Sequence, residues 1–345
     1  MKDAVCRFLQ EEISFGRIKG GEKLPTIDEI SESTGLTYGK ARSVVERLEK
    51  EGYVHSRPYV GTVVLPRGGK ILRGRVLLVL PDVDTYRYHS VQLISTVGRK
   101  LTENGYAFSV ATFSHDETDD MAFLKSELLR ATDLVVAVHA TPKVQKALAE
   151  SGVNHIFAYG DKPEFEGRPW IRFSPETAIS HFASHCARSG VEHVMQVHFA
   201  GSKVFDVHNA LANVGIDSSW ITISPGNAGE MRFDDAVRST YETFATMPRS
   251  KIKDLFLFWS PYITQGAVTA FLDRGIRLPE DVKVVTLSDA GFAPVYTKSF
   301  TRFEVNAVRA GEKVADFAIA VLAKGRIPRP PKISPQYVFG ATFPF

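Results

Sequence analysis

The sequence has little of what stabilises small secreted domains or membrane proteins. Its 345 residues include only two cysteines, Cys6 and Cys186, so a disulfide framework and a thiolate zinc site are both excluded. No apolar run approaches the roughly 20 residues that a membrane-spanning helix needs, because stretches such as VLLVLP and DLFLFW have the length of buried strands. The first residues, MKDAVCRFLQEEI, lack the basic start and apolar middle of a signal peptide. We therefore expect a cytoplasmic protein with no membrane partner.

An excess of charge of one sign is also absent from the chain as a whole. Lysine and arginine number 42 against 39 aspartates and glutamates, and the resulting net charge of +3 does not by itself indicate a nucleic-acid partner. The placement of charge is more informative, because residues 36–70 hold seven basic residues against three glutamates. A hydrophobic content of 44% is typical of a folded globular protein, and the length suggests two or three domains.

Motifs that carry enzymatic chemistry are missing as well. The sequence has no GxxxxGK[ST] loop, GxGxxG turn or GxSxG elbow, which phosphate-binding and hydrolase sites require. His181 and His185 have ligand-like spacing near Cys186 and His193, but the carboxylate of an HExxH motif is absent and helix periodicity alone produces such pairs. We predict no catalytic residue, no metal and no cofactor, and therefore not an enzyme.

Two helices are predicted at the start of the chain. Apolar residues at helical spacing predict the first from about Asp3 to Ser14. The second begins after Thr26, which forms a capping box with Glu29, and ends at Gly35.

A third helix and a hairpin follow at once. Thr37 caps the helix, which ends at Gly52, and its buried stripe comprises Ala41, Val44, Val45 and Leu48. Residues 53–65 then predict two short strands around Pro58 and Gly61. Two helices joined by a glycine turn form a helix-turn-helix, and a hairpin behind its recognition helix is a wing. In this arrangement, contacts with the DNA backbone can position the domain and contacts with base edges can read the sequence.

Residues 20–64, GGEKLPTIDEISESTGLTYGKARSVVERLEKEGYVHSRPYVGTVV, resemble the winged helix-turn-helix of GntR-type transcription regulators. The shared pattern is a Leu-Pro before the second helix, a small residue capping the third helix and a Gly-Thr in the wing. The resemblance implies binding to a double-stranded DNA operator, with Thr37 matching a phosphate-contacting cap and Arg42 a DNA-contacting arginine. Asp28 and Tyr38 replace arginines that commonly read guanine in the family, so the usual operator sequence is not implied. A winged helix that docks on a protein partner is the alternative.

We predict nine DNA-binding residues in residues 1–66: Thr26, Thr37, Tyr38, Gly39, Lys40, Arg42, Arg57, Tyr59 and Gly61.

The rest of the chain alternates strands with helices after a linker at residues 67–74. Two such series, meeting near Pro175, predict an α/β protein in which two lobes of doubly wound parallel sheets face each other. Ligands of open parallel sheets bind at the carboxyl ends of the strands, so we expect a small-molecule site between the lobes.

This second part resembles the effector domain of LacI/GalR regulators, which is itself similar to periplasmic sugar-binding proteins. RVLLVLPDVD, LTENGYAFSVATF and above all GAVTAFLDRGIRLPEDVKVVTLSDA carry the resemblance. It implies a periplasmic-binding-protein-like domain over residues 75–345, with a first lobe at 75–173 and 291–322 and a second at 174–290 and 323–345. It also implies a homodimer, with the first lobe as interface, that binds a palindromic operator as a repressor and responds to a sugar or similar effector.

The positions that bind ligand in relatives differ here. Ser260 and Pro261 replace an Asn-Asp pair, Ser288 replaces an aspartate, and Lys203 replaces an arginine, which weakens the case for an ordinary hexose. Aromatic and polar residues at strand ends suit a sugar ring, although a strand-end aromatic is more often part of the core or of the packing between lobes. The effector candidates are Tyr86, Tyr88, His139, Phe173, Lys203, Trp259 and Asp289.

Overall fold

The computed structural model describes residues 2–14, 17–57, 59–65, 73–81, 88–113, 132–160, 162–163, 169–200, 204–224, 233–252, 254–324 and 327–345. The chain forms two compact units, of which the first comprises Met1–Val76, Leu101–Ser109 and Ala131–Asp133, and the second comprises the remainder. Most of the expected linker lies outside the described residues. Within the described residues, no helix has the length and apolar character needed to cross a membrane.

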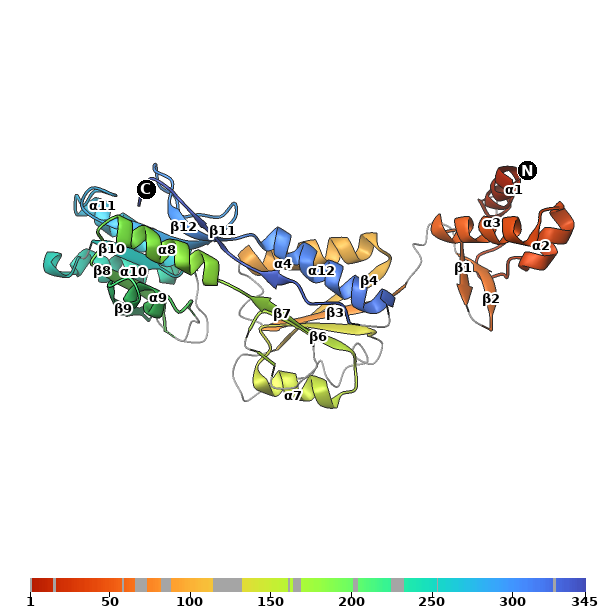
Figure 1. Cartoon of the computed structure of the whole chain (residues 1–345), viewed down its shortest axis with the longest axis horizontal. Coiled ribbons are helices and arrows are strands. Elements are labelled where there is room, and N and C mark those ends of the chain that lie inside the picture. Colours follow the sequence, from red (N-terminus) through yellow and green to blue (C-terminus); the bar gives the residue numbers. More distant parts are fainter. Residues whose placement is uncertain are drawn as a thin grey trace. The chain divides into compact units, whose positions relative to one another are not determined.

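The first unit begins with three helices and a hairpin, as the sequence predicts (Figure 1). The capping box is confirmed, because Thr26 N–H donates to Glu29 Oε2 at 2.7 Å and Glu29 N–H donates to Thr26 Oγ1 at 3.3 Å. The buried stripe of the third helix packs with Leu9, Ile13 and Ile30 in one core. The elements are α1 Lys2–Ser14, α2 Ile27–Thr34, α3 Tyr38–Lys50, β1 Val54–Arg57 and β2 Gly61–Val64.

The wing is anchored on both of its edges. Strands β1 and β2 pair antiparallel, and the segment before α2 adds to the free edge of β2, with Leu24 N–H donating to the Thr62 carbonyl and Gly21 N–H to the Val64 carbonyl, both at 2.8 Å. A two-stranded hairpin alone is marginally stable, so this extra pairing makes the wing a fixed part of the fold.

The first lobe is built on a six-stranded sheet with the order β13-β7-β6-β5-β3-β4. Helices α4 and α12 lie side by side on one face of this sheet and α7 lies on the other (Figure 1). An ion pair at 2.7 Å between Lys100 of α4 and Asp316 of α12 links the two helices. Its elements are β3 Gly74–Pro81, α4 Tyr88–Glu103, β4 Tyr106–Phe113, β5 Leu134–Val138, α7 Pro142–Glu150, β6 His155–Ala158, β7 Trp170–Phe173, α12 Ala307–Lys324 and β13 Lys332–Ile333.

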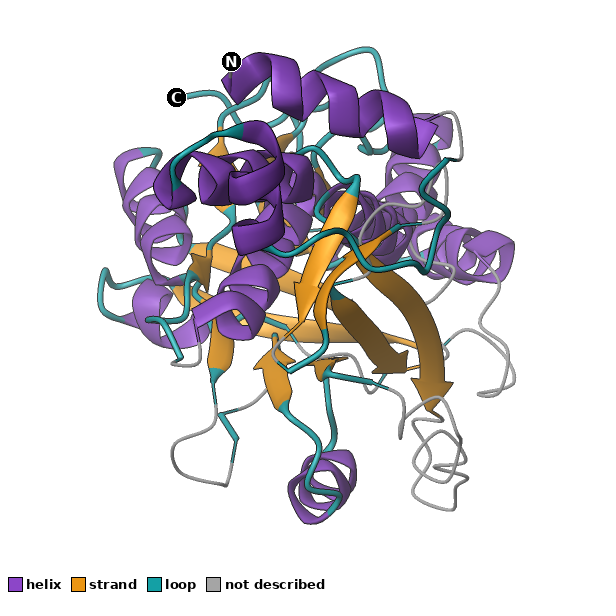
Figure 2. Cartoon of the chain, turned by 90° about the vertical axis from the view of Figure 1, so that its right-hand side faces the viewer, coloured by secondary structure: helices purple, strands orange, loops and turns teal. Residues whose placement is uncertain are grey.

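The second lobe is built on a six-stranded sheet with the order β14-β12-β11-β10-β8-β9, and helices and strands alternate along the chain. Figure 2 shows the chain coloured by secondary structure, with helices in purple and strands in orange. Its elements are α8 Glu176–Arg188, β8 His193–Phe199, α9 His208–Ala212, β9 Asp217–Ile223, α10 Phe233–Thr246, η2 Arg249–Lys251, β10 Leu255–Phe258, α11 Pro261–Asp273, β11 Lys283–Asp289, β12 Thr301–Val305 and β14 Gln336–Val338.

Strand β10 explains why this sheet has continuous apolar runs. Leu255 and Leu257 pack with the helices α8 and α9, whereas Phe256 and Phe258 pack with α10 and α11. A parallel strand covered on both faces must be apolar on both sides, which is how the sequence DLFLFW arises. The doubly wound α/β architecture predicted from the sequence is therefore confirmed.

The structure corrects the points at which the chain crosses between lobes. Strand β12 pairs with β11 in the second sheet, so the chain returns to the first lobe after Val305 and not at residue 291. Strand β13 belongs to the first sheet, so the last crossing follows Ile333 and not residue 322. The short segment TRFEV concealed this strand, because only Thr301, Phe303 and Val305 are buried and charged residues lie between them.

A close helix contact in the second lobe predicts the effect of a single methyl group. A Cβ added at Gly266 would lie 2.9 Å from Thr240 Cβ and 3.0 Å from Tyr241 N, and closer still to the Val237 carbonyl oxygen. Since backbone atoms cannot move aside, we expect Gly266→Ala to destabilise the lobe by about 1–3 kcal/mol, measured as a lower melting temperature in calorimetry. The control is Gly39→Ala in α3, where no atom lies within 4 Å, and which should be neutral or stabilising by about 0.5–1 kcal/mol. Equal effects of the two substitutions would contradict the assignment of a tight contact.

A buried histidine predicts a pH dependence of stability. His185 is 1% exposed, and its Nε2 lies 3.0 Å from the Pro344 carbonyl while its Nδ1 lies 2.8 Å from the Tyr337 hydroxyl. A carbonyl only accepts, so Nε2 carries the hydrogen and Nδ1 accepts from the tyrosine. Burial lowers the pKa of His185 below its ordinary value.

The unfolded chain therefore binds a proton below about pH 6.5 that the folded chain resists. Because the folded-state pKa of this base is depressed, the stability is present above that pH and is lost as the pH falls. We expect the urea midpoint of the second lobe to drop between pH 7 and pH 5, and to drop less in His185→Gln. His181→Gln, an exposed histidine on the same helix, is the control and should keep the full dependence. A His185→Gln profile identical to that of the unsubstituted protein would refute this origin.

Candidate functional site

The first candidate site is the outer face of α3 together with the wing. Ala41 and Val44 are fully buried, which turns Tyr38, Lys40 and Arg42 towards solvent. Exposed side chains at the start of such a helix are the ones that reach base edges in helix-turn-helix proteins. The structure thus places the predicted residues Thr37, Tyr38, Gly39, Lys40 and Arg42 on one exposed helical turn.

The two capping threonines have different roles in the structure. The Thr26 hydroxyl accepts from Glu29 N–H in the capping box. Hydrogen bonds from the Thr26 backbone N–H and side chain to the Glu29 carboxylate lower the pKa of that glutamate. Thr37 caps α3 through its backbone, and within the described residues its hydroxyl makes no capping hydrogen bond. The Thr37 hydroxyl is therefore available for a phosphate oxygen.

Arg42 is held by a weak contact. Its Nε lies 3.0 Å from Glu46 Oε1, and the two side chains are 64% and 62% exposed. Exposed ion pairs of this kind contribute little stability, so the guanidinium can leave Glu46 for a phosphate or a base at little cost. Arg47 is held more firmly, because it contacts both Glu51 at 2.8 Å and Asp3 at 2.9 Å, which ties α3 to α1.

Glu49, which the sequence analysis did not single out, fixes the wing against α3. Its Oε1 accepts from Ser56 N–H at 2.9 Å and lies 3.1 Å from His55 Nδ1. The wing residue Arg57 is exposed beside this anchor and pairs with Gly61 across the hairpin. A glutamate in the last turn of a helix that is followed directly by a hairpin was the available signal, but helix-face glutamates are too common to be informative.

The second candidate site lies where the strands of both sheets end. His139 follows β5, Phe173 ends β7, Trp259 follows β10 and Asp289 ends β11, which agrees with the strand-end positions expected for a ligand site. Tyr86 and Lys203 lie outside the described residues.

Two of these aromatics make packing contacts in the structure. Trp259 is 7% exposed, its Nε1–H donates to Gln196 Oε1 at 3.1 Å, and its ring contacts Phe205 at a centroid distance of 5.0 Å. Phe173 packs between Phe205 and Tyr159, at 5.3 and 5.9 Å. The rings thus form a continuous chain from the first lobe into the second.

A polar cluster that is also at the strand ends joins the two lobes. His89, on the first turn of α4, places Nδ1 2.7 Å from Asp289 Oδ1 of the second lobe and Nε2 3.1 Å from the Tyr159 hydroxyl of the first. The carboxylate only accepts, so Nδ1 carries a hydrogen and donates it to Asp289. Burial raises the pKa of Tyr159, and the negative charge of Asp289 raises it further, so this hydroxyl stays protonated.

A second contact between the lobes flanks this cluster. The predicted residue Tyr88 stacks on Phe292 at a centroid distance of 4.9 Å, and Phe292 also contacts Tyr262 at 5.6 Å. The structure therefore brings Tyr88 and Asp289 together with His89 and Tyr159. The last two were missed, although Tyr159 follows β6 directly and so shares the strand-end position of the other candidates.

The serines that replace the expected ligand groups are used differently. Ser260 caps α11, accepting from Tyr262 N–H at 3.3 Å, so it serves the helix. Ser288 is 2% exposed, and its Oγ has no hydrogen-bond partner among the described residues.

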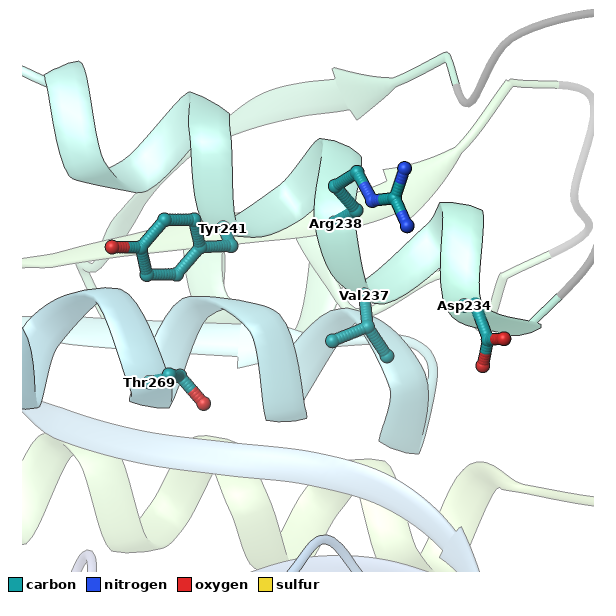
Figure 3. Close-up of a pocket in the computed structure, with 5 residues that line it drawn as sticks. All are labelled: Asp234, Val237, Arg238, Tyr241 and Thr269. Carbon is teal, nitrogen blue, oxygen red and sulfur yellow. The ribbon is translucent and has the colours of Figure 1, made fainter.

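A shallow hollow of about 380 Å³ lies elsewhere on the second lobe (Figure 3). Asp234, Val237, Arg238 and Tyr241 of α10 line it with Thr269 of α11. None of the described effector candidates reaches it, and a hollow between two surface helices lacks the strand-end position of the polar cluster. Neither it nor any other part of the described chain gathers three or more His, Cys, Asp or Glu residues that could hold a metal ion.

Comparison with known families assigns both parts of the chain. Residues 146–343 match the periplasmic binding protein-like domain family, and residues 2–64 match the gntR family of bacterial regulatory proteins. No curated protein matches the sequence.

Several solved structures share the fold. A LacI family transcriptional regulator from Bifidobacterium animalis subsp. lactis DSM 10140 is 15% identical, with a TM-score of 0.62 over 79% of this chain and 98% of that one. The transcriptional regulator CelR in complex with cellobiose is 15% identical, with a TM-score of 0.60 over 92% of this chain and 100% of that one. A LacI family transcriptional regulator from Arthrobacter sp. FB24 in complex with lactose is 16% identical, with a TM-score of 0.60 over 79% and 99% of the two chains.

Proposed function

The chain belongs to the periplasmic binding protein-like domain family and is a transcription regulator with a gntR-type N-terminal domain, and we propose that it is a repressor controlled by a small polar metabolite. The observation that carries this proposal is the exposed turn of α3 beside an anchored wing, joined in one chain to two facing lobes. Its activity would be regulated binding and not catalysis.

The DNA-binding part would work as one half of a homodimer on a palindromic operator. Arg42, Lys40 and Thr37 would contact the major groove and its phosphates, and Arg57 would reach the backbone beside it. Tyr38 can contact a thymine methyl or a sugar, but it cannot grip guanine with two hydrogen bonds as an arginine does. We therefore infer an operator that differs from those read by two arginines.

The effector domain, residues 75–345, would bind its ligand between the lobes and hold the dimer together. Cellobiose and lactose in two structures of the same fold support a sugar or a similar polyhydroxy compound. The histidine, carboxylate and phenol of the cluster of His89, Asp289 and Tyr159 offer hydrogen bonds of the kind that hydroxyl groups make. A ligand there would replace the direct contact between the lobes by contacts of its own, which would change the lobe arrangement and hence the spacing of the two DNA-binding heads.

The DNA-binding proposal predicts opposite effects for the two partners of an exposed ion pair. Arg42→Ala should weaken binding to a duplex from the protein's own upstream region by about tenfold or more, and reduce the salt dependence by about one phosphate contact. Glu46→Ala should tighten binding, because it removes a negative charge from the same face and releases Arg42. Fluorescence anisotropy at several salt concentrations measures both.

The matched control is Arg277→Ala, which breaks an exposed pair with Asp281 on the second lobe and should change nothing. Unchanged affinity in Arg42→Ala would contradict the assigned face. A protein that binds no duplex but retains a partner protein through residues 1–66 would favour the alternative, a sensor whose winged helix docks on protein.

The effector proposal predicts a ligand-dependent melting temperature. Among cellobiose, lactose and their monosaccharides, a true effector should raise the melting temperature by several degrees, because at about a hundredfold excess over Kd it stabilises the folded state by about 2.7 kcal/mol. Asp289→Asn should abolish most of this rise. Asp273→Asn, a carboxylate bonded to Tyr241 on the outer surface, is the control and should keep it. A full rise in Asp289→Asn would place the ligand elsewhere.

A further inference from the structure

The tip of the wing carries an aromatic residue in a backbone conformation that disfavours it. Val60 N–H donates to the Arg57 carbonyl at 3.2 Å and closes a four-residue turn, in which Tyr59 has a φ of 64°. This left-handed region suits glycine, and asparagine tolerates it, but a large side chain is strained there. Gly61, two residues on, has a φ of 96° and is the residue type that such a backbone favours.

Nothing in the folded domain accounts for this choice. The Tyr59 side chain is fully exposed, and among the described residues it makes no hydrogen bond and no ring contact. Glycine at this position would form the same turn without strain. A residue that costs stability and has no contact inside the fold is expected where the side chain acts on something outside it.

The surroundings of Tyr59 indicate what it acts on. Val60 beside it is 44% exposed, so the tip presents an aromatic and an aliphatic side chain together, with the exposed Arg57 at its base. A cation that can hold a phosphate, next to an apolar tip, has the character of groove-binding elements that press an apolar side chain against a base step.

The wing also holds this tip in a fixed place relative to α3. Glu49 binds the Ser56 amide at 2.9 Å, and the Ser56 and Thr62 hydroxyls lie 3.1 Å apart across the hairpin. When α3 lies in the major groove, the tip is thus pre-organised to reach the flanking minor groove without first becoming ordered.

We propose that Tyr59 is a specificity-determining residue that packs its ring against, or wedges it into, one base step in the minor groove beside each half-site. It would favour a deformable pyrimidine–purine step there, because such steps unstack most easily. The inference rests on the proposed DNA binding, which it deepens by adding a contact that reads DNA deformability and not base hydrogen bonds.

The test uses the full-length protein and a duplex that it selects from a random-sequence pool. Tyr59→Gly and Tyr59→Asn, which both suit a positive φ, should bind this duplex about tenfold more weakly, the size expected for the loss of one stacked aromatic contact. Their melting temperatures should be equal to or above that of the unsubstituted protein. The slope of affinity against salt should not change, since no phosphate contact is lost. Tyr59→Phe keeps the ring and should retain affinity within about twofold.

Two further measurements test whether Tyr59 unstacks one base step. 2-Aminopurine placed at successive flanking positions should brighten at one step with the unsubstituted protein and with Tyr59→Phe, but not with Tyr59→Gly. Repeating the selection with Tyr59→Gly should relax the sequence preference at that step alone. Equal affinity and the same selected sequence in Tyr59→Gly and Tyr59→Asn would overturn the inference while leaving DNA binding intact. If the unsubstituted protein selected no duplex at all, the proposed function itself would fail, and this inference with it.

Discussion

The burial of both faces of the second sheet is the constraint on which the rest of the effector domain depends. Leu255, Phe256, Leu257 and Phe258 are all fully buried between helices, so this strand has no room for a polar group along its length. A ligand site of such a sheet is expected where a strand ends and the chain enters a loop. Asp289 at the end of β11 and Tyr159 after β6 occupy such positions, one in each lobe.

The contact between the lobes follows from that arrangement. His89 spans the gap by bonding to a carboxylate of one lobe and a phenol of the other, while the stacked pair of Tyr88 and Phe292 lies beside it. Among the described residues these are local hydrogen bonds and ring contacts, and a ligand that makes similar contacts can compete with them. A ligand of ordinary affinity can therefore shift the balance between lobe arrangements, whereas a large apolar interface between the lobes would resist it.

Sequence reasoning recovered what depends on neighbouring residues. The capping box of Thr26 and Glu29, the stripe of α3 and the hairpin around Gly61 are local patterns with a direct physical cause, and all appear in the structure. The crossing after Val305 was missed, because the pairing of β12 with β11 is set by strands distant in sequence. The hydrogen bond of Trp259 could not be predicted for a related reason, since only the fold brings the buried Gln196 to its indole nitrogen.

The two candidate sites differ in the same way: one depends on neighbouring residues and the other on residues far apart in the sequence. The exposed turn of α3 could be predicted because helix periodicity determines which residues face outward. The cluster of His89, Asp289 and Tyr159 could not, because its members are separated by 70 and 200 positions and meet only through the packing of two lobes. The anchor from Glu49 to Ser56 lies between these cases, at a separation of seven residues.

The charge on the DNA-binding face also affects how the proposed regulation could work, because it determines how tightly a single DNA-binding domain binds. Of the basic residues on α3, Arg42 is partly neutralised by Glu46, and Arg47 is engaged by Glu51 and Asp3. These pairs reduce the positive charge that one DNA-binding domain offers to phosphates, which lowers its own affinity for DNA at physiological salt. In the proposed homodimer, the second DNA-binding domain would bind the same operator at a high effective concentration that depends on the distance between the two domains. A modest change in lobe arrangement that alters this distance would remove most of the affinity, which is the response that a ligand-controlled repressor needs.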